Sequence, residues 1–321
     1  MSALTSGRPE RLLPPLPPAR PPFPVTAPHR VVPAPRPLDG TPHVELDDAW
    51  PAALRRRVER LETDPSGVLV RADQRDDPGL LAAVRAAWGL LPEGDGALPL
   101  LGVRLDAAGR AHVTGPSVDT RATALLMTRE GLELLVTAWL LACSDDLVVL
   151  RRGGAGVLQA ELLAVAFPSG WPPRLRAGAS LLELHGPVAD GERLQRAAPA
   201  LSEALLTKGP LRQHVWGLDP DGRLDRDPSA PDAPAAEVPD DPADWWLRVE
   251  RQTSVPLPAL DRALFTIRPH LVPLTALTPQ QCARLAAAVA SMGPEGRRYK
   301  GILTVADDLV RWLQFRVGSS G

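Results

Sequence analysis

The sequence has 321 residues, of which 44% are hydrophobic, and this is enough apolar side chain to build one or two cores. The 36 basic and 38 acidic residues are interspersed and give a formal net charge of −2. This balance argues against the strongly basic surface that binds nucleic acids or anionic membranes.

The composition carries a strong nucleotide bias. Asparagine is absent and lysine occurs only at Lys208 and Lys300, which is typical of a GC-rich bacterial genome. The excess of arginine is therefore no binding signal, whereas Lys300, beside the only tyrosine, Tyr299, stands out. Two distant cysteines and the lack of a signal peptide or a membrane-spanning apolar stretch predict a soluble, cytoplasmic protein.

The N-terminal part is predicted to be an extended segment followed by helices. Residues 8–37 are rich in proline, which favours a polyproline-like or disordered conformation. Apolar residues at helical spacing predict a helix from about residue 47, another after Asp77, and a longer one over residues 122–142. Residues 98–114 predict a hairpin between the second and third helices.

From residue 145 onward the pattern is that of strands. Two apolar runs around the Gly-rich turn "GGAG" predict a hairpin, and no Gly-Lys-Ser/Thr follows to make a phosphate loop. Residues 219–243, rich in Asp, Pro and Ala, predict a surface loop that cannot pack well. Further strands are predicted over 211–218, 246–254 and 263–268, and helices over 191–206, 279–292 and 304–316.

Helices followed by mostly antiparallel strands predict an α+β fold. We expect residues 1–40 to form the extended segment and residues 41–321 to form a single domain. Common catalytic motifs are missing: the sequence has no nucleophile elbow, no zinc-binding pattern and no dinucleotide fingerprint.

The stretch "WLRVERQTSV" raises the question of a buried arginine. As a strand it places Arg251 on an otherwise apolar face with Leu247 and Val249, and Arg248 on the other face. A buried guanidinium needs a partner, and an internal Arg–Asp or Arg–Glu pair is the favoured interpretation over a bound ligand. A hairpin with "LFTIR" would bring Arg268 nearby.

Five segments in order resemble the family of haem-dependent oxidative N-demethylases, alpha-subunit-like. They are "AVAFPSGW", "LLELHGPV", "WLRVERQTSVPLP", "LFTIRPHLVPL" and "RRYKG". Together they cover about residues 144–301, while residues 1–140 match only loosely. Each segment alone is a weak signal, but the ordered series is specific.

The resemblance implies a PAS-like antiparallel sheet flanked by helices, with an N-terminal helical region, that holds haem b. It also implies a monooxygenase that oxidises a small secondary amine such as dimethylamine to the primary amine and formaldehyde. Electrons would come from NADPH through partner subunits that carry FMN and an iron–sulfur cluster. No motif for these electron carriers occurs in this chain.

The resemblance also suggests site residues. His185, at the end of "LLEL", would leave the sheet and bind the haem iron through a neutral imidazole, with His214 and His270 as competitors. Tyr299 and Lys300 are the candidate catalytic residues. The candidates for contacts with the haem are the cations Arg248, Arg251, Arg268 and Lys300, together with Trp171 and Phe167 as pocket walls.

Two departures from the family pattern leave alternatives open. Val215 stands where the family often has asparagine, and Ser144-Asp145-Asp146 replaces Gln-Glu-Asp. The chain could therefore act on a different amine. The alternatives are a non-enzymatic haem-binding sensor or carrier, and a PAS-like scaffold without haem in which His185 is a buried core residue.

Overall fold

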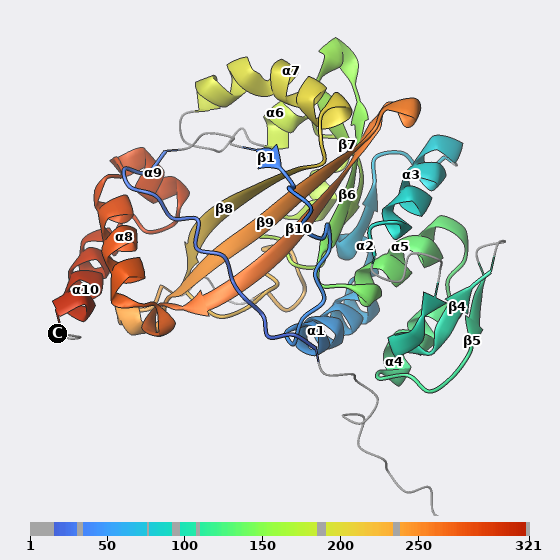
Figure 1. Cartoon of the computed structure of the whole chain (residues 1–321), viewed down its shortest axis with the longest axis horizontal. Coiled ribbons are helices and arrows are strands. Elements are labelled where there is room, and N and C mark those ends of the chain that lie inside the picture. Colours follow the sequence, from blue (N-terminus) through green and yellow to red (C-terminus); the bar gives the residue numbers. More distant parts are fainter. Residues whose placement is uncertain are drawn as a thin grey trace, which may run out of the picture.

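The computed structural model describes residues 16–30, 35–75, 77–91, 97–106, 110–184, 191–233 and 238–318. Its centre is a seven-stranded antiparallel sheet in the order β1-β8-β9-β10-β6-β7-β2 (Figure 1). Its strands are β1 (Arg36–Pro37), β2 (Leu69–Arg71), β6 (Asp146–Arg152), β7 (Leu158–Ala164), β8 (Leu211–Asp219), β9 (Trp246–Leu257) and β10 (Arg262–Pro273). A small second sheet contains β3 (Ala97–Leu98), β4 (Val103–Leu105) and β5 (Ala111–Val113).

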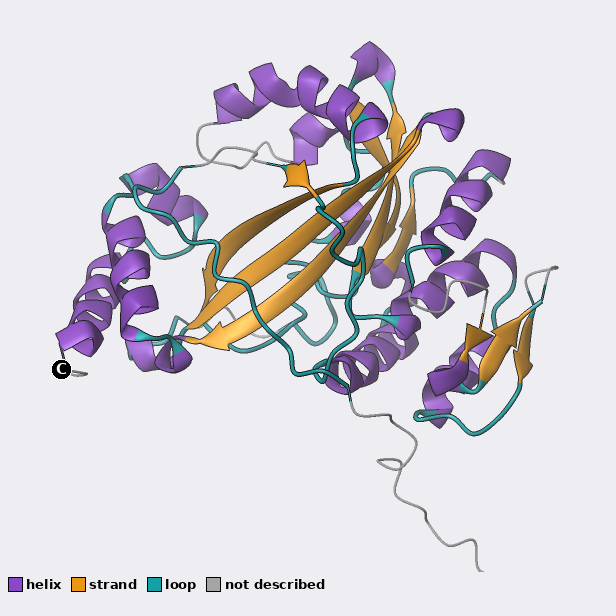
Figure 2. Cartoon of the chain, in the orientation of Figure 1, coloured by secondary structure: helices purple, strands orange, loops and turns teal. Residues whose placement is uncertain are grey.

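Helices surround the large sheet, so the predicted α+β fold is confirmed (Figure 2). No helix in the described ranges is long and apolar enough to cross a membrane. The helices are α1 (Trp50–Thr63), α2 (Pro65–Val68), α3 (Pro78–Trp88), α4 (Thr120–Met127), α5 (Gly131–Ala142), α6 (Leu181–Leu184), α7 (Gly191–Thr207), α8 (Pro279–Ala290), α9 (Pro294–Tyr299) and α10 (Ala306–Gly318).

Two local predictions were wrong, and one short helix was missed. The single helix expected over residues 122–142 is two helices, because the chain turns between Thr128 and Gly131, where the glycine has φ +55°. The segment "LLEL" is the helical turn α6 and not a strand that leaves the sheet. The short helix α9, which carries Tyr299, was not expected at all.

The two faces of the large sheet pack against different helices. On the α1 face, side chains such as Leu147, Val149 and Leu264 join a core with helices α1, α3 and α5. On the α7 face, Val148 and Ile267 pack with residues of α7. Because neighbouring strand residues point to opposite faces, every strand residue can be assigned to one of these two environments.

The proline-rich segment lies along the α1 face over its described residues 16–30. Val25 is buried in a second core on this face, formed with helices α8 and α10. The backbone N–H of Ala19 donates to the Asp48 side chain and that of His29 to Ser291. Residues 16–30 are thus held against the rest of the protein, whereas residues 8–15 and 31–34 lie outside the described part of the chain.

The loop that follows β8 packs more tightly than the sequence suggested. Asp225 and Asp227 are each only 2% exposed, and both carboxylates pair with Arg60 of α1, at 3.0 and 3.3 Å. The expectation of a surface loop that cannot pack was wrong for this part, because a buried guanidinium offers these aspartates charged hydrogen-bond partners.

Replacing Arg60 with methionine should lower the free energy of unfolding by about 3–5 kcal/mol, because it removes the cation that Asp227 pairs with and leaves the buried Asp225 with only the longer contact to Arg56. Guanidinium-chloride unfolding measures this loss. The matched control is Arg121→Met, which breaks the exposed pair with Glu62 and should cost about 1 kcal/mol or less. Equal effects in the two variants would contradict the prediction.

Candidate functional site

The strand register divides the predicted arginines between the two faces of the sheet. Arg251 of β9 lies beside Arg268 of β10 and His214 of β8, all on the α1 face. Arg248, three residues earlier, points to the α7 face with Glu250. The hairpin that was expected to bring Arg268 close to Arg251 is therefore present.

Both arginines of the α1 face are held by carboxylates of the protein. Arg251 pairs with Glu45 at 2.8 Å and with the fully buried Asp145 at 3.4 Å. The Nη2 of Arg268 donates to both carboxylate oxygens of Asp47, at 2.7 and 2.8 Å. These are the internal ion pairs that the sequence favoured for Arg251, and they tie residues 42–47 across the sheet.

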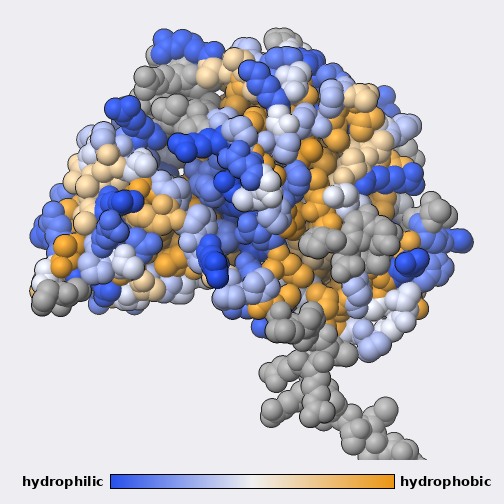
Figure 3. All heavy atoms as spheres, in the orientation of Figure 1, coloured by the Kyte–Doolittle hydropathy of each residue, from blue (hydrophilic) through white to orange (hydrophobic). Residues whose placement is uncertain are grey.

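Residues 42–47 cross the sheet between the two cores of the α1 face. Arg251 donates to the carbonyls of Pro42 and His43, and Arg268 donates to that of Glu45. The N-terminal segment runs in front of β9 and β10 in Figure 1, and Figure 3 shows hydrophilic residues gathered over the middle of the same view. The polar groups of Arg251 and Arg268 on this part of the α1 face are thus bonded to residues 42–47 of the same chain.

The competing histidines His214 and His270 both lie on the α1 face. His270 is 6% exposed, and its Nε2 has no hydrogen-bond partner among the described residues. Burial, followed by the nearby Arg268 and Arg251, lowers the pKa of His270 to about 3. Burial, then Arg212 and Arg251, also lowers the pKa of His214.

His185 lies outside the described residues, but the residue before it, Leu184, is described. Leu184, the last residue of α6, packs against the core of the α7 face. Trp171 packs against the same core. Phe167, by contrast, is 1% exposed in the core of the α1 face, with the Arg57 guanidinium 4.7 Å from its ring centroid.

A carboxylate that the sequence analysis missed lies at the centre of the α7 face. Glu250 accepts hydrogen bonds from the Ser169 hydroxyl and, at 3.0 Å, from the side-chain amide of Gln252. The amide of Gln213 in turn donates to Gln252 at 2.8 Å. Every donor in this chain points toward Glu250, whose carboxyl oxygens are the final acceptors.

Val215 lies directly opposite Glu250 on the neighbouring strand β8 and is 39% exposed. Val215, which stands where the family often has asparagine, therefore lies beside the carboxylate of Glu250. The signal for Glu250 was already present in "RVERQT", because the alternate residues Arg248, Glu250 and Gln252 form one polar strand face.

The loop after β8 positions the donor Ser169. The backbone N–H of Gly170 donates to the carbonyl of Arg226, and that of Arg226 donates to the carbonyl of Pro168, both at 3.1 Å. Arg248 fixes the same region, since it donates to the carbonyls of Phe167 and Leu224 at 2.7 and 3.0 Å. The buried Nε of Arg248 has no hydrogen-bond partner in the described part of the chain.

Tyr299 and Lys300 lie close enough to Glu250 to respond to its charge. Tyr299 is 43% exposed, and its partial burial and then Glu250 raise its pKa. Burial lowers the pKa of Lys300 to about 8, although the charge of Glu250 acts in the opposite direction. The Lys300 ammonium donates to the Trp216 carbonyl on β8.

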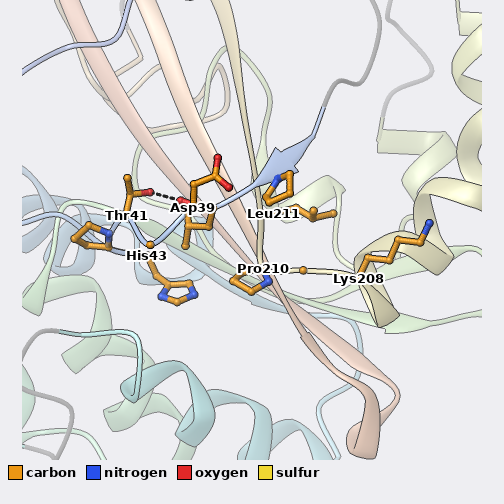
Figure 4. Close-up of a pocket in the computed structure, with 11 residues that line it drawn as sticks. Asp39, Thr41, His43, Lys208, Pro210 and Leu211 are labelled. Atoms are coloured by element: carbon orange, nitrogen blue, oxygen red, sulfur yellow. Dashed lines mark hydrogen bonds between the residues drawn. The ribbon is translucent and has the colours of Figure 1, made fainter.

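A separate pocket of about 730 Å³ opens beside β1 and is lined by residues 37–43 and 208–211. Its polar side chains Asp39, His43 and Lys208 point in different directions and do not converge (Figure 4). No group of three or more His, Cys, Asp or Glu residues suited to a metal ion occurs within the described ranges. The hydrogen-bonded group of Ser169, Glu250, Gln252 and Gln213 on the α7 face is therefore the stronger candidate site.

The fold and site define an α+β protein with a fixed carboxylate on one sheet face. Residues 34–310 match the family "Haem-dependent oxidative N-demethylase, alpha subunit-like", and the chain belongs to this family. The family assignment made from the sequence is confirmed, and the match extends into the N-terminal region, which resembled the family only loosely.

Acid should destabilise the fold through His270. Its pKa is lower in the folded protein than the unfolded value of 6.5, so the unfolded state binds more protons as the pH falls. By pH 5 this group alone should cost about 2 kcal/mol. Urea unfolding of the wild type and of His270→Phe at pH 8 and pH 5 isolates this contribution.

Between pH 8 and pH 5, the free energy of unfolding should fall by about 2 kcal/mol less in His270→Phe than in the wild type. The control His112→Phe removes an imidazole whose side chain is 56% exposed. If the pH dependence of His270→Phe were the same as that of the wild type, His270 would not be the buried neutral group described here.

Proposed function

We propose that this chain is a haem-dependent monooxygenase that removes an N-methyl group from a small secondary amine such as dimethylamine. The family match supports the haem-dependent oxidative chemistry. The observation in the structure that favours an amine substrate is Glu250, whose carboxylate is only 13% exposed. It accepts hydrogen bonds from the neutral donors Ser169 and Gln252, and the Arg248 Nε is 3.7 Å away.

A secondary amine is a cation near neutral pH, because aliphatic amines have pKa values close to that of lysine, about 10.4. Its ammonium N–H groups can donate to Glu250, which then orients the N-methyl groups and can accept a proton. Val215 offers an apolar surface beside this carboxylate. An asparagine there would be more polar, so the departure at Val215 suits the alkyl groups of an amine.

The residues of the α7 face fit haem b in their chemistry. Trp171 contributes apolar area there. We propose Arg248 as the cation for a haem propionate, since its buried Nε has no hydrogen-bond partner in the described part of the chain and its closest carboxylate contact there, Glu250, is 3.7 Å away. We propose His185 as the axial ligand, since the preceding Leu184 packs on this face. Haem supplies the activation of O2 when it is bound.

The two arginines of the α1 face are less suited to propionates, because Arg251 and Arg268 pair with carboxylates at 2.8 and 2.7 Å. The carboxylates of Asp219 and Glu250 are farther from Arg248, at 3.5 and 3.7 Å. His214 and His270 lie on that face as well. Tyr299 and Lys300 remain proposed catalytic residues near Glu250, with the tyrosine hydroxyl as a hydrogen-bond donor to the reacting groups.

The order β8-β9-β10-β6-β7, with α6 and α7 in the connection from β7 to β8, supports a PAS-like arrangement. The family description names an alpha subunit. We therefore propose that NADPH delivers electrons through partner subunits that carry FMN and an iron–sulfur cluster. The primary amine and formaldehyde would be the products.

Reconstitution with hemin should produce a Soret band that His185→Ala loses or strongly alters, because the iron loses its imidazole. His214→Ala and His270→Ala are the matched controls and should keep the wild-type spectrum. An unchanged spectrum in His185→Ala, with a change in one control, would move the ligand to that histidine. No Soret band at all would favour the haem-free scaffold.

Glu250→Gln keeps the shape of the side chain but removes its charge. The haem-loaded variant should bind dimethylamine about tenfold to a hundredfold more weakly, which is the usual loss for a hydrogen bond to a charged group. The amine-induced change in the haem spectrum measures this affinity, and amine-dependent formaldehyde release with a supplied reductant measures turnover.

The control Gln213→Ala changes the far end of the same hydrogen-bond chain and should have a smaller effect. Equal amine affinity in the wild type and Glu250→Gln would remove Glu250 from the substrate site. A wild-type protein that binds haem but neither responds to the amine nor releases formaldehyde would favour the sensor or carrier.

A further inference from the structure

Asp146 carries a buried carboxylate that the proposed chemistry does not use. The residue begins β6 and is 0% exposed. Its Oδ1 accepts from the backbone N–H of Ala166 and its Oδ2 from that of Phe167, both at 3.1 Å, and Arg57 of α1 pairs with it at 2.8 Å. Because hydrogen bonds to an ionised acceptor are stronger than neutral ones, Asp146 fixes these two peptide groups of the segment that follows β7.

The backbone of Phe167 is held on both sides by groups of opposite charge. Asp146 accepts from its N–H, and the Nη2 of Arg248 donates to its carbonyl at 2.7 Å. The ring is buried as well, with the Arg57 guanidinium 4.7 Å from its centroid. Contacts from β6, β9 and α1 therefore fix both backbone torsions of Phe167.

Only Pro168 separates this held residue from Ser169. The pyrrolidine ring fixes the φ angle of Pro168 and restricts the residue before it to extended conformations. The backbone of Arg226 pairs with the residues on either side of Ser169. Few soft torsions remain, so the direction of the Ser169 hydroxyl toward Glu250 follows from how Phe167 is held.

We propose that Asp146 is a positioning residue of the Glu250 site and that it acts through Ser169. It holds the segment after β7 so that the Ser169 hydroxyl donates to Glu250 and keeps that carboxylate oriented toward its ligand. That the ligand is a secondary amine rests on the proposed function. The positioning is a property of the protein without haem, and it can be tested there by itself.

Asp146→Asn keeps the size of the side chain but leaves it one acceptor oxygen, so its NH2 group would face one of the two peptide N–H groups. Crystal structures of the full-length protein without haem show the consequence directly. We expect the Ser169 hydroxyl to donate to Glu250 in the wild type and to lie out of hydrogen-bond distance in Asp146→Asn.

Asp145→Asn is the matched control, because Asp145 is the neighbouring fully buried aspartate and pairs with Arg251 on the α1 face. This variant should keep the contact between Ser169 and Glu250. A contact that is retained in Asp146→Asn, or lost equally in both variants, would overturn the proposal.

Pro168→Ala is a milder second variant in case Asp146→Asn does not fold. It leaves the contacts of Asp146 in place but restores rotation between Phe167 and Ser169. We expect the Ser169 hydroxyl to become disordered or to leave Glu250. An unchanged, well-ordered contact would show that the constraint on Phe167 does not reach Ser169 and would overturn the proposal.

The protein with haem gives a second readout, which is the amine-induced change in the haem spectrum. Asp146→Asn and Ser169→Ala should each weaken amine binding about tenfold, and the double variant should bind no more weakly than Ser169→Ala. Additive losses would mean that Asp146 does not act through Ser169. A wild type that does not respond to the amine would contradict the proposed function alone, because the crystallographic comparison involves neither haem nor amine.

Discussion

The alternation of side chains along β9 is the constraint on which the rest of the structure depends. This twelve-residue strand lies in the middle of the sheet, paired with β8 on one side and with β10 on the other. Its odd-numbered residues meet the N-terminal segment and the helical cores, and its even-numbered residues meet the α7 side. A shift by one residue would exchange Arg251 with Glu250 or Gln252 and bury each charge away from its partner.

The two faces use their charges differently. On the α1 face, arginines pair with carboxylates and hold residues 42–47 in place, so these charges stabilise the fold. On the α7 face, Glu250 has neutral hydrogen-bond donors, and its nearest cation, Arg248, is 3.7 Å away and largely committed to carbonyls. A fixed carboxylate of this kind can still receive a cationic ligand.

Loops that are distant in sequence support this arrangement. Arg60 anchors Asp225 and Asp227, the backbone of Arg226 between them pairs with the segment around Ser169, and Ser169 donates to Glu250. The position of the carboxylate therefore depends on a buried ion pair with the first helix. The sequence of the loop alone, rich in Asp and Pro, gave no sign of this role.

The sequence predicted most of the elements because hydrophobic periodicity reports local burial directly. It also anticipated an internal partner for Arg251, since a lone charge on an apolar strand face requires one. It did not reveal that Arg268 pairs with Asp47, because that contact joins segments more than 200 residues apart. The break at Gly131 and the helical form of "LLEL" depend on packing that periodicity cannot report.

The most direct test of the central claim is to locate the iron. A crystal structure of the haem-reconstituted protein, with anomalous data collected at the iron edge, gives the position of the metal without reference to any catalytic assay. We predict one iron on the α7 face of the sheet, bound by His185 and on the side of Glu250. An iron on the α1 face beside His214 or His270, or crystals that take up no haem, would contradict this account.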